Sequence, residues 1–477
     1  MDTKLFQLSE SVLEQLSKKE LIQIILRLSQ SCCDLYQYNQ KLEQRVNDLE
    51  NQLKKFNKNS NTSSKPPSQD IHKQNQFKKN QSLRKKSGKR SGGQKGHKGM
   101  NRAQVDNPDK IITCEPEQCS NCGKSLYDQH GTISERRQER DIPPIEVIIT
   151  EYQQIEKQCS CGCINQGKFP DNIQSYVQIG ANAQAFLVYL NVAQLIPFKR
   201  LKDIANDLFG FSISEGSIDN ILNYSELRAR PLYKMIMNIV KSNKWVGSDE
   251  TGIRVEGQRD WLWVWQNNLA SYYAIEDSRG YQVPLKHFGE NYEGSFIHDC
   301  WSAQNNTKAL NGHQQCHPHL QRFLQFLVEA YNSKWAYDLN KLLYKSQQAQ
   351  ERIWQADFNN KIREQVIRDY EHQLQAFIDH PLTEKEAITL QKRFRKHKDS
   401  IFHFLSSSDI PFHNNDSEKA IRNAKVKQKI SGSFRSRKGA DRYAILLSII
   451  ETAKKQGFNL LDTIKALLNN RLVFQGC

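Results

Sequence analysis

The chain has 477 residues, a formal net charge of +16 and a hydrophobic fraction of 38%. This length exceeds one ordinary core, so we expect roughly two to four domains. The low hydrophobic fraction indicates that part of the chain is extended, coiled or disordered. The charge favours a polyanionic partner, nucleic acid before an anionic membrane.

We expect neither a membrane-spanning nor an exported protein. No apolar run approaches the roughly 18–20 residues of a spanning helix, and the N-terminus lacks the pattern of a signal peptide. We therefore expect a cytoplasmic protein. In that compartment the eleven cysteines serve as metal ligands or buried thiols rather than as disulfides.

A heptad repeat occupies the first segment, residues 1–57. Its seam positions follow a 4-3-4-3 spacing over about five heptads, which predicts a coiled coil. Asn39 falls within the seam, where a buried amide sets register. The segment predicts a homodimer or higher oligomer; the alternative is an amphipathic helix packed on its own domain. The seam consists of Leu21, Ile25, Leu28, Cys32, Leu35, Asn39, Leu42, Val46, Leu49, Leu53 and Phe56.

Residues 58–108 are expected to be a disordered basic linker. Between Lys73 and Arg102 there are eleven Lys and Arg residues and no acidic residue. On a Gly- and Ser-rich backbone such a run can follow phosphates and release counterions, although many basic runs are only solvated tails. The predicted DNA-binding side chains here are Lys85, Lys86, Lys89, Arg90, Lys95 and Lys98.

Two groups of cysteines predict a zinc-ribbon domain over residues 109–175. Cys119 and Cys122 are followed by a glycine, as in a zinc knuckle. Their partners come from the run at 159–163: Cys159 and Cys161 are favoured, and Cys163 is the alternative. A strand is expected at 145–152 between the groups because that stretch is rich in β-branched residues. We therefore expect these cysteines to bind a structural Zn²⁺; the alternative is structural cysteines without metal.

A helical region is expected over residues 176–243. A helix that ends at Gly210 is followed by a short turn and by a second helix capped by Ser214. The pattern resembles a helix-turn-helix, but the second helix is acidic. Helix packing therefore competes with reading of a DNA groove.

In the segment 244–457 the hydrophobic pattern changes from the period of helices to the two-residue period of strands. Strands are expected at 245–251, 261–265, 272–275 and 295–299, with a short helix near 283–288. Three antiparallel strands, a helix and a further strand predict a ribonuclease-H-like α/β domain, in which the first and fourth strands are neighbours. Asp249 and Asp299 end these two strands, so their carboxylates would share one site.

Two close carboxylates repel each other unless a cation lies between them. Two Mg²⁺ ions, with Mn²⁺ as a substitute, would relieve the repulsion and assist phosphodiester displacement. A third acid is needed, and Glu418 suits this role if Asn415 or Asp416 caps a helix there. Glu250, Glu256 and Asp416 are rival acids.

The remaining segments complete the predicted organisation. Residues about 320–405 are expected to form an all-α insertion in the catalytic domain, and residues 458–477 a C-terminal helix. A cationic stretch after Glu418 suits a groove for the DNA backbone; a solvated basic loop is the alternative. Its predicted DNA-binding residues are Arg422, Lys425, Lys427, Arg435, Arg437 and Lys438, with Lys429 and Arg442 beside them.

The ordered motifs resemble the insertion sequence 66 family of transposases. They comprise residues 61–68, 92–99, the cysteine pair near 120, 249–251, 414–422 and 448–457. The resemblance implies an Asp-Asp-Glu transposase and assigns its acids to Asp249, Asp299 and Glu418. It also implies that Cys316 and His319 brace the site; zinc there is a minority alternative because only two ligands are in view.

Three departures from the family pattern leave the assignment of Asp299 as the second acid the least secure of the three. The stretch after Asp299 lacks a tyrosine, His413 stands where Asp is common, and Lys419 where Arg is common. The expected protein is a multidomain α+β transposase that binds double-stranded DNA at element ends and target, with helper proteins of the same element, in a bacterial nucleoid. A nuclease of the same fold and a domesticated DNA-binding protein are the alternatives.

Overall fold

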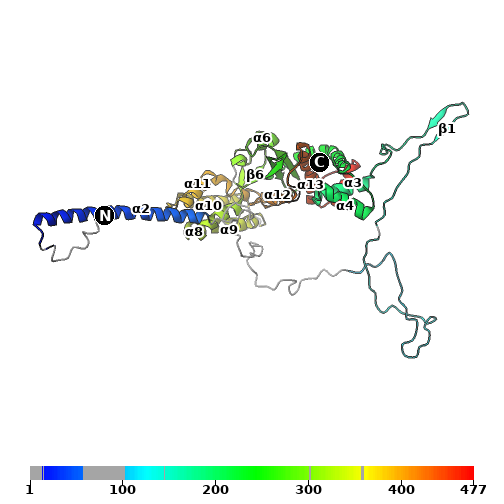
Figure 1. Ribbon diagram of the computed structural model, residues 1–477, viewed down its shortest axis with the longest axis horizontal. Helices are drawn as coiled ribbons and strands as arrows, with labels where there is room; N and C mark the ends of the chain where they lie inside the picture. The colour runs from blue at the N-terminus through cyan, green and yellow to red at the C-terminus, as the bar shows by residue number, and fades with distance from the viewer. Residues whose placement is uncertain are drawn as a thin grey trace. The chain divides into compact units, whose positions relative to one another are not determined.

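The computed structural model describes residue 13 and residues 15–56, 103–143, 145–299, 302–355 and 359–476 (Figure 1). The chain divides into two compact units. One comprises Met1–Lys73, Asn172–Asp203 and Ile213–Cys477, and the other comprises Gln74–Asp171 and Ile204–Ser212. The basic side chains predicted at 85–98 lie outside the described residues. None of the described helices is long and apolar enough to cross a bilayer.

A five-stranded mixed sheet forms the centre of the larger unit, in the order β5-β4-β3-β6-β7. The first three strands are antiparallel, whereas β6 pairs parallel with β3 and β7 parallel with β6. The predicted adjacency of the first and fourth strands is thus confirmed. The strands are β3 (Trp245–Val255), β4 (Gln258–Gln266), β5 (Ser271–Glu276), β6 (Ser295–His298) and β7 (His313–Gln315).

Strand β3 is longer than its sequence pattern predicts. The expectation that it ends at its acids near residue 251 is wrong, because it continues to Val255 and pairs along its length with β4. Glu256 and Gly257 close this hairpin with φ angles of 51° and 79°, which is the left-handed backbone of a tight two-residue turn. Asp249 therefore lies in mid-strand.

Alternate residues of β4 pack on opposite faces of the sheet. Leu262 and Val264 meet a core built with helices α12 and α13, while Trp263 and Trp265 stack on the other face, where α6 supplies His287 and Phe288. Both faces are covered, which explains the apolar and aromatic composition of β4. The helices named here are α6 (Gln282–Phe288), α12 (Asn415–Ser431) and α13 (Arg437–Lys455).

The segment between β7 and α12 is helical in its described part and has its own apolar core. This core includes Leu324, Leu339 and Phe394, and it also takes in Ile297 of β6. It is built on α8 (His317–Tyr331), α9 (Lys334–Gln355), α10 (Asn360–Asp379), α11 (Lys385–Lys396), and the 3₁₀ turns Lys398–Ser400 and His403–Ser406.

The remaining helices lie before and after the sheet domain, apart from α7, which lies between β6 and β7. The first is α2 (Lys18–Phe56), a single continuous rod in Figure 1. The others are α3 (Ala181–Val188), the π-helical turn Tyr189–Ala193, α4 (Phe198–Phe209), α5 (Glu215–Lys241), the short α7 (Ser302–Asn305) and α14 (Leu460–Leu468).

The smaller unit contains one short hairpin, β1 (Glu156–Gln158) with β2 (Ile164–Gln166). The strand expected at 145–152 is wrong: its described residues carry no strand, and Ile148 and Ile149 are exposed. β-Branched residues favour strands because their side chains pack well on a half-buried pleated surface. Without a partner strand or a core to cover it, the stretch forms no strand.

Candidate active site

Asp249 lies within β3, and Asp299 directly follows β6, the parallel neighbour of β3. The register pairs Trp245 with Ser295 and Gly247 with Ile297. The pairing ends at Gly247 and Ile297, and each acid lies two residues further along its chain segment, Asp249 within β3 and Asp299 just past the end of β6. Because residues with the same parity in a strand share a face, Asp249 belongs to the face of β3 that carries Ile253, which packs against α12.

Glu418 reaches this face from the first turn of α12, as predicted. The predicted cap is wrong: the helix begins after Asn414, and neither Asn415 nor Asp416 caps it. The side chain of Asn414 is used elsewhere, because its Nδ2 donates to the carbonyl oxygen of Ser248, 2.7 Å away. This bond ties the start of α12 to β3 beside Asp249.

Helix α12 is also held at Gly247, where a side chain would not fit. A Cβ at this position would lie 2.7 Å from Ser417 Oγ, 2.8 Å from Gln266 Nε2 and 3.0 Å from Asn414 Oδ1. Gln266 Nε2 donates to Ser417 Oγ at 3.1 Å, and Lys455 Nζ donates to Gln266 Oε1. The helix that carries Glu418 therefore rests directly on the backbone of β3.

The three predicted acids affect one another electrostatically. Burial raises the pKa of Asp249 well above its usual value, and the charges of Asp299, Glu250 and Glu418 raise it further. The oxygens of Asp249, Asp299 and Glu418 do not all lie within 4.8 Å of one another.

Cys316 and His319 flank Glu418 from the start of α8. His319 Nδ1 lies 3.6 Å from Glu418 Oε1, and the backbone N–H of Asn414 donates to Cys316 Sγ at 3.3 Å. Burial raises the pKa of Cys316 to about 12. It lowers the pKa of His319, an effect that Asp299 and Glu418 oppose. The two residues expected to brace the site thus lie against its third acid.

Glu250 is a buried acid for which sequence reasoning found no partner. Its carboxylate pairs with Arg279 at 2.6 Å and accepts from Gln304 Nε2 at 2.9 Å. Burial raises the pKa of Glu250 to about 7, with repulsion from Asp299 added and attraction to Arg279 opposed to it. Its position next to Asp249 is visible in the sequence, whereas its two partners come from distant segments.

The other rival acids have partners away from the triad. Glu256 Oε1 accepts from the backbone N–H of Arg437, and Asp416 pairs with Lys419 on the exposed face of α12. Neither contributes to the pKa shift of Asp249. These contacts leave Glu418 as the acid of α12 that meets Asp249.

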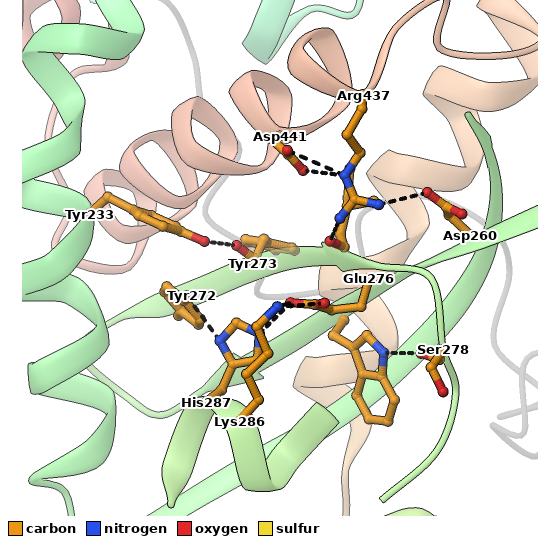
Figure 2. A network of polar contacts seen from close by, with 12 residues as sticks. Tyr233, Asp260, Tyr272, Tyr273, Glu276, Ser278, Lys286, His287, Arg437 and Asp441 are labelled. Atoms are coloured by element: carbon orange, nitrogen blue, oxygen red, sulfur yellow. Dashed lines mark hydrogen bonds and ion pairs between the residues drawn. The ribbon is translucent and has the colours of Figure 1, made fainter. Parts of the chain in front are cut away.

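Some cations predicted to bind DNA are used inside the protein. Arg437 pairs with Asp260 and Asp441 and donates to the carbonyl oxygen of Ile275 (Figure 2). Burial lowers the pKa of Lys427 to about 8, and Arg442 is only 8% exposed. Arg437 is thus engaged in ion pairs within the protein, and Lys427 is half-buried. Arg422, Lys425, Lys429, Arg435 and Lys438 are exposed.

The same network continues across the sheet edge. Burial opposes ionisation of Glu276, but hydrogen bonds from His287 and Lys286 lower its pKa to about 2. His287 Nδ1 also lies 3.2 Å from Tyr272 Oη, and Tyr233 of α5 donates to the carbonyl oxygen of Tyr273 (Figure 2). These contacts join β5 to α5 and α6. They therefore stabilise the sheet and are not part of the site of Asp249 and Glu418.

Helix α5 packs against α13 through its acidic side. The predicted cap is confirmed, since Ser214 accepts from the backbone N–H of Ser217. Asp219 Oδ1 and Asn223 Oδ1 each accept from Arg442 of α13 at 2.7 Å. This face of the helix is therefore occupied within the protein, which favours helix packing over reading of a DNA groove.

The two cysteine groups form separate turns in the smaller unit. Hydrogen bonds from the backbone N–H groups of Cys122 and Asn121 lower the pKa of Cys119, and those from Cys161 lower the pKa of Cys159. Each turn is closed by a glycine with positive φ, at 123 and 162. Among the described residues these thiols do not gather into a set of three or more ligands within 4.8 Å.

Comparison with known families agrees with this architecture. The family model described as Transposase IS66 family matches residues 176–442, more than half of the chain and including all three acids. A second model, a family of unknown function (DUF6444), matches residues 10–103. No curated protein matches the chain. The chain belongs to the IS66 family of transposases.

Proposed function

We propose that this protein cuts and joins DNA with a divalent-metal site built from Asp249, Asp299 and Glu418, in a ribonuclease-H-like domain. The observation that carries the proposal is the contact of the first turn of α12, which holds Glu418, with β3 beside Asp249; the raised pKa of Asp249, to which the charges of Asp299 and Glu418 contribute, agrees with it. A divalent cation reverses this penalty because it favours the ionised carboxylates. The strand order β5-β4-β3-β6-β7 supports the fold assignment.

In this proposal each acid has a distinct placement. Asp249 comes from β3, Asp299 from the residue that follows the adjacent strand β6, and Glu418 from a helix that rests on β3. When bound, two Mg²⁺ ions, or Mn²⁺ in their place, would activate the attacking oxygen and stabilise the leaving oxygen. Asn414 and Gly247 keep Glu418 in place, and exposed Arg422 and Lys425 hold the DNA backbone by charge.

The substrates are the element's own ends and a target duplex. Hydrolysis of a phosphodiester frees a 3′-hydroxyl, and that hydroxyl then attacks the target strand and displaces a new 3′-oxygen as leaving group. The basic linker and a cysteine-bound Zn²⁺ at Cys119, Cys122, Cys159 and Cys161 would serve end binding, with α2 joining protomers and helper proteins of the element taking part. The separated cysteine turns supply thiols of suitable chemistry but not an assembled four-ligand site.

The test uses purified full-length protein, Mg²⁺ and linear DNA that carries the element's terminal repeats. We expect both cleavage and a strand-transfer product. Asp249→Asn and Glu418→Gln should each slow cleavage by at least about a hundredfold, since even residues behind metal ligands cost tenfold to a hundredfold. DNA affinity should be retained.

Asp416→Asn is the matched control, because Asp416 lies in the same helical turn as Glu418 but on its exposed side. Its cleavage rate should equal that of the parent protein. Unchanged cutting in Asp249→Asn and Glu418→Gln would refute the site. Cleavage without any strand-transfer product would instead make the protein a nuclease.

A further inference from the structure

Cys316, His319 and Glu418 form the one set of three or more potential metal ligands that gathers among the described residues. One ligand atom of each lies within 4.8 Å of the others. Cys316 is the N-cap of α8, His319 lies in the first turn of that helix, and Glu418 lies in the first turn of α12. Two helix starts from distant parts of the chain therefore meet at this point.

Two polar atoms in this cluster have no hydrogen-bond partner. His319 Nδ1 and Glu418 Oε1 are both buried atoms without a partner, and His319 is only 7% exposed. Their separation of 3.6 Å is too long for a hydrogen bond. Buried polar atoms in native proteins are nearly always paired, so an unpaired couple of this kind points to an ion that would satisfy both.

The spacing suits a tetrahedral metal. Bonds of about 2.0–2.3 Å from a metal to nitrogen, oxygen and sulfur place the ligand atoms roughly 3.3–3.6 Å apart. The measured distance of 3.6 Å between His319 Nδ1 and Glu418 Oε1 lies at the edge of this range. We propose that Cys316, His319 and Glu418 bind a thiophilic divalent cation, Zn²⁺ foremost, at the margin of the carboxylate site.

The ligand chemistry selects the class of ion. Sulfur and imidazole ligands suit Zn²⁺ and Co²⁺, whereas Mg²⁺ takes oxygen ligands. Binding exchanges the proton of the Cys316 thiol for the metal, and that proton leaves to solvent. The backbone N–H of Asn414, 3.3 Å from Cys316 Sγ, then stabilises the thiolate. Three protein ligands leave one coordination position open.

The site has a regulatory consequence that rests on the proposed function. Glu418 serves both the thiophilic ion and the Mg²⁺ pair, so occupancy by Zn²⁺ withdraws an acid from the cleavage site. Zn²⁺ should therefore inhibit Mg²⁺-dependent cleavage even when Mg²⁺ is in large excess. The inhibition should weaken when Cys316 is replaced, because the thiol is the ligand that favours Zn²⁺ over Mg²⁺.

Binding is tested with Co²⁺ alone, added to metal-free full-length protein. The parent protein should bind one more Co²⁺ per chain than Cys316→Ser or His319→Gln, and should show a stronger thiolate-to-cobalt charge-transfer absorption than Cys316→Ser. Cys114→Ser is the matched control, because Cys114 is an exposed free cysteine outside the cluster. Equal stoichiometry in the parent and both cluster variants, each with unchanged circular dichroism, would overturn the proposal.

Inhibition is tested separately by adding Zn²⁺ to cleavage reactions. Cys316→Ser should need at least tenfold more Zn²⁺ than the parent protein or Cys114→Ser for half-inhibition. Equal sensitivity, together with lost Co²⁺ binding, would overturn the competition for Glu418. A parent protein that binds the extra Co²⁺ but never cleaves DNA would instead count against the proposed function, so the two failures are distinguishable.

Discussion

At the residue scale, consecutive acids in β3 have opposite environments. Asp249 faces the side that α12 covers, while Glu250 points to the other side, where Arg279 and Gln304 bind it. A one-residue difference in a strand reverses the face of the sheet. Asp249 thus experiences the charges of Asp299 and Glu418, whereas its neighbour Glu250 pairs with Arg279.

Glu250 predicts a pH dependence of stability. Its pKa of about 7 exceeds the usual 4.5, so between these values the folded state holds a proton that the unfolded chain has released. The free energy of unfolding should therefore fall as pH rises through this window, by about 3 kcal/mol. Glu250→Gln removes this loss, so its melting temperature should rise relative to the parent from pH 5 to pH 8.

The measurement is thermal unfolding in the presence of a chelator, which keeps metal ions from changing the titration. Glu290→Gln is the control because Glu290 is exposed, and its difference from the parent should not vary with pH. A Glu250→Gln protein that loses stability relative to the parent as pH rises would show that the ion pair with Arg279 dominates over burial.

At the scale of elements, the contact between α12 and β3 decides where Glu418 lies. The contact is short-range on both sides: Asn414 binds the backbone of Ser248, and Ser417 sits over Gly247. No residue of this contact is itself one of the three acids. We therefore expect activity to depend on residues that never touch DNA or metal.

Gly247→Ala should reduce cleavage by roughly a hundredfold, because a Cβ would force Ser417 and the helix outward and displacement of about 1 Å is that costly. Gly252→Ala on the same strand is the control, since its Cβ would meet atoms no closer than 3.5 Å. Cleavage rates under saturating DNA provide the measurement. A fully active Gly247→Ala protein would show that α12 tolerates the shift.

At the scale of the whole molecule, α2 presents an apolar stripe without a partner in the described chain. Leu42, Val46 and Leu49 are each between 43% and 54% exposed, at the seam positions of the predicted heptads. Exposed apolar stripes of this regularity are buried when two such helices associate. The stripe supports the proposal that protomers join through α2.

Leu42→Asp combined with Val46→Asp should weaken self-association at least about a hundredfold, because carboxylates buried in the seam each cost several kcal/mol. Gln40→Asp with Gln44→Asp is the control, since both positions lie off the seam. Analytical ultracentrifugation of the full chain gives the oligomeric state. A seam variant that stays oligomeric would place the interface elsewhere.

The basic linker is a second property of the whole molecule. Replacing residues 58–102 by a Gly/Ser segment of equal length should lower the slope of log affinity against log salt for DNA by several units, at most about 10. A shuffled linker with the same charge is the control and should keep the slope. An unchanged slope in the uncharged version would show that the linker makes no phosphate contacts.

Local pattern predicted much of the fold. Periods of two residues and the aromatic runs located β3 to β6 and α6, and the ribonuclease-H-like order of these elements predicted that β3 and β6 are neighbours; the short strand β7 was not predicted. The pattern failed at 145–152, where β-branched residues have no partner strand, and at the end of β3, where pairing with β4 extends the strand past its acids. Both failures concern pairing, which a local pattern does not encode.

The sequence by itself singled out Asp249, Asp299 and Glu418 as candidate acids, through expected strand positions and the family resemblance. Only the tertiary structure decided how the other charged residues are paired and which residues surround Glu418. Arg437 and Arg442, read as groove cations, are instead held by Asp260 and Asp219, and Glu418 meets Cys316 and His319. Such partners lie far apart in sequence, and their pairing depends on packing of whole elements, which is why residue order alone could not assign them.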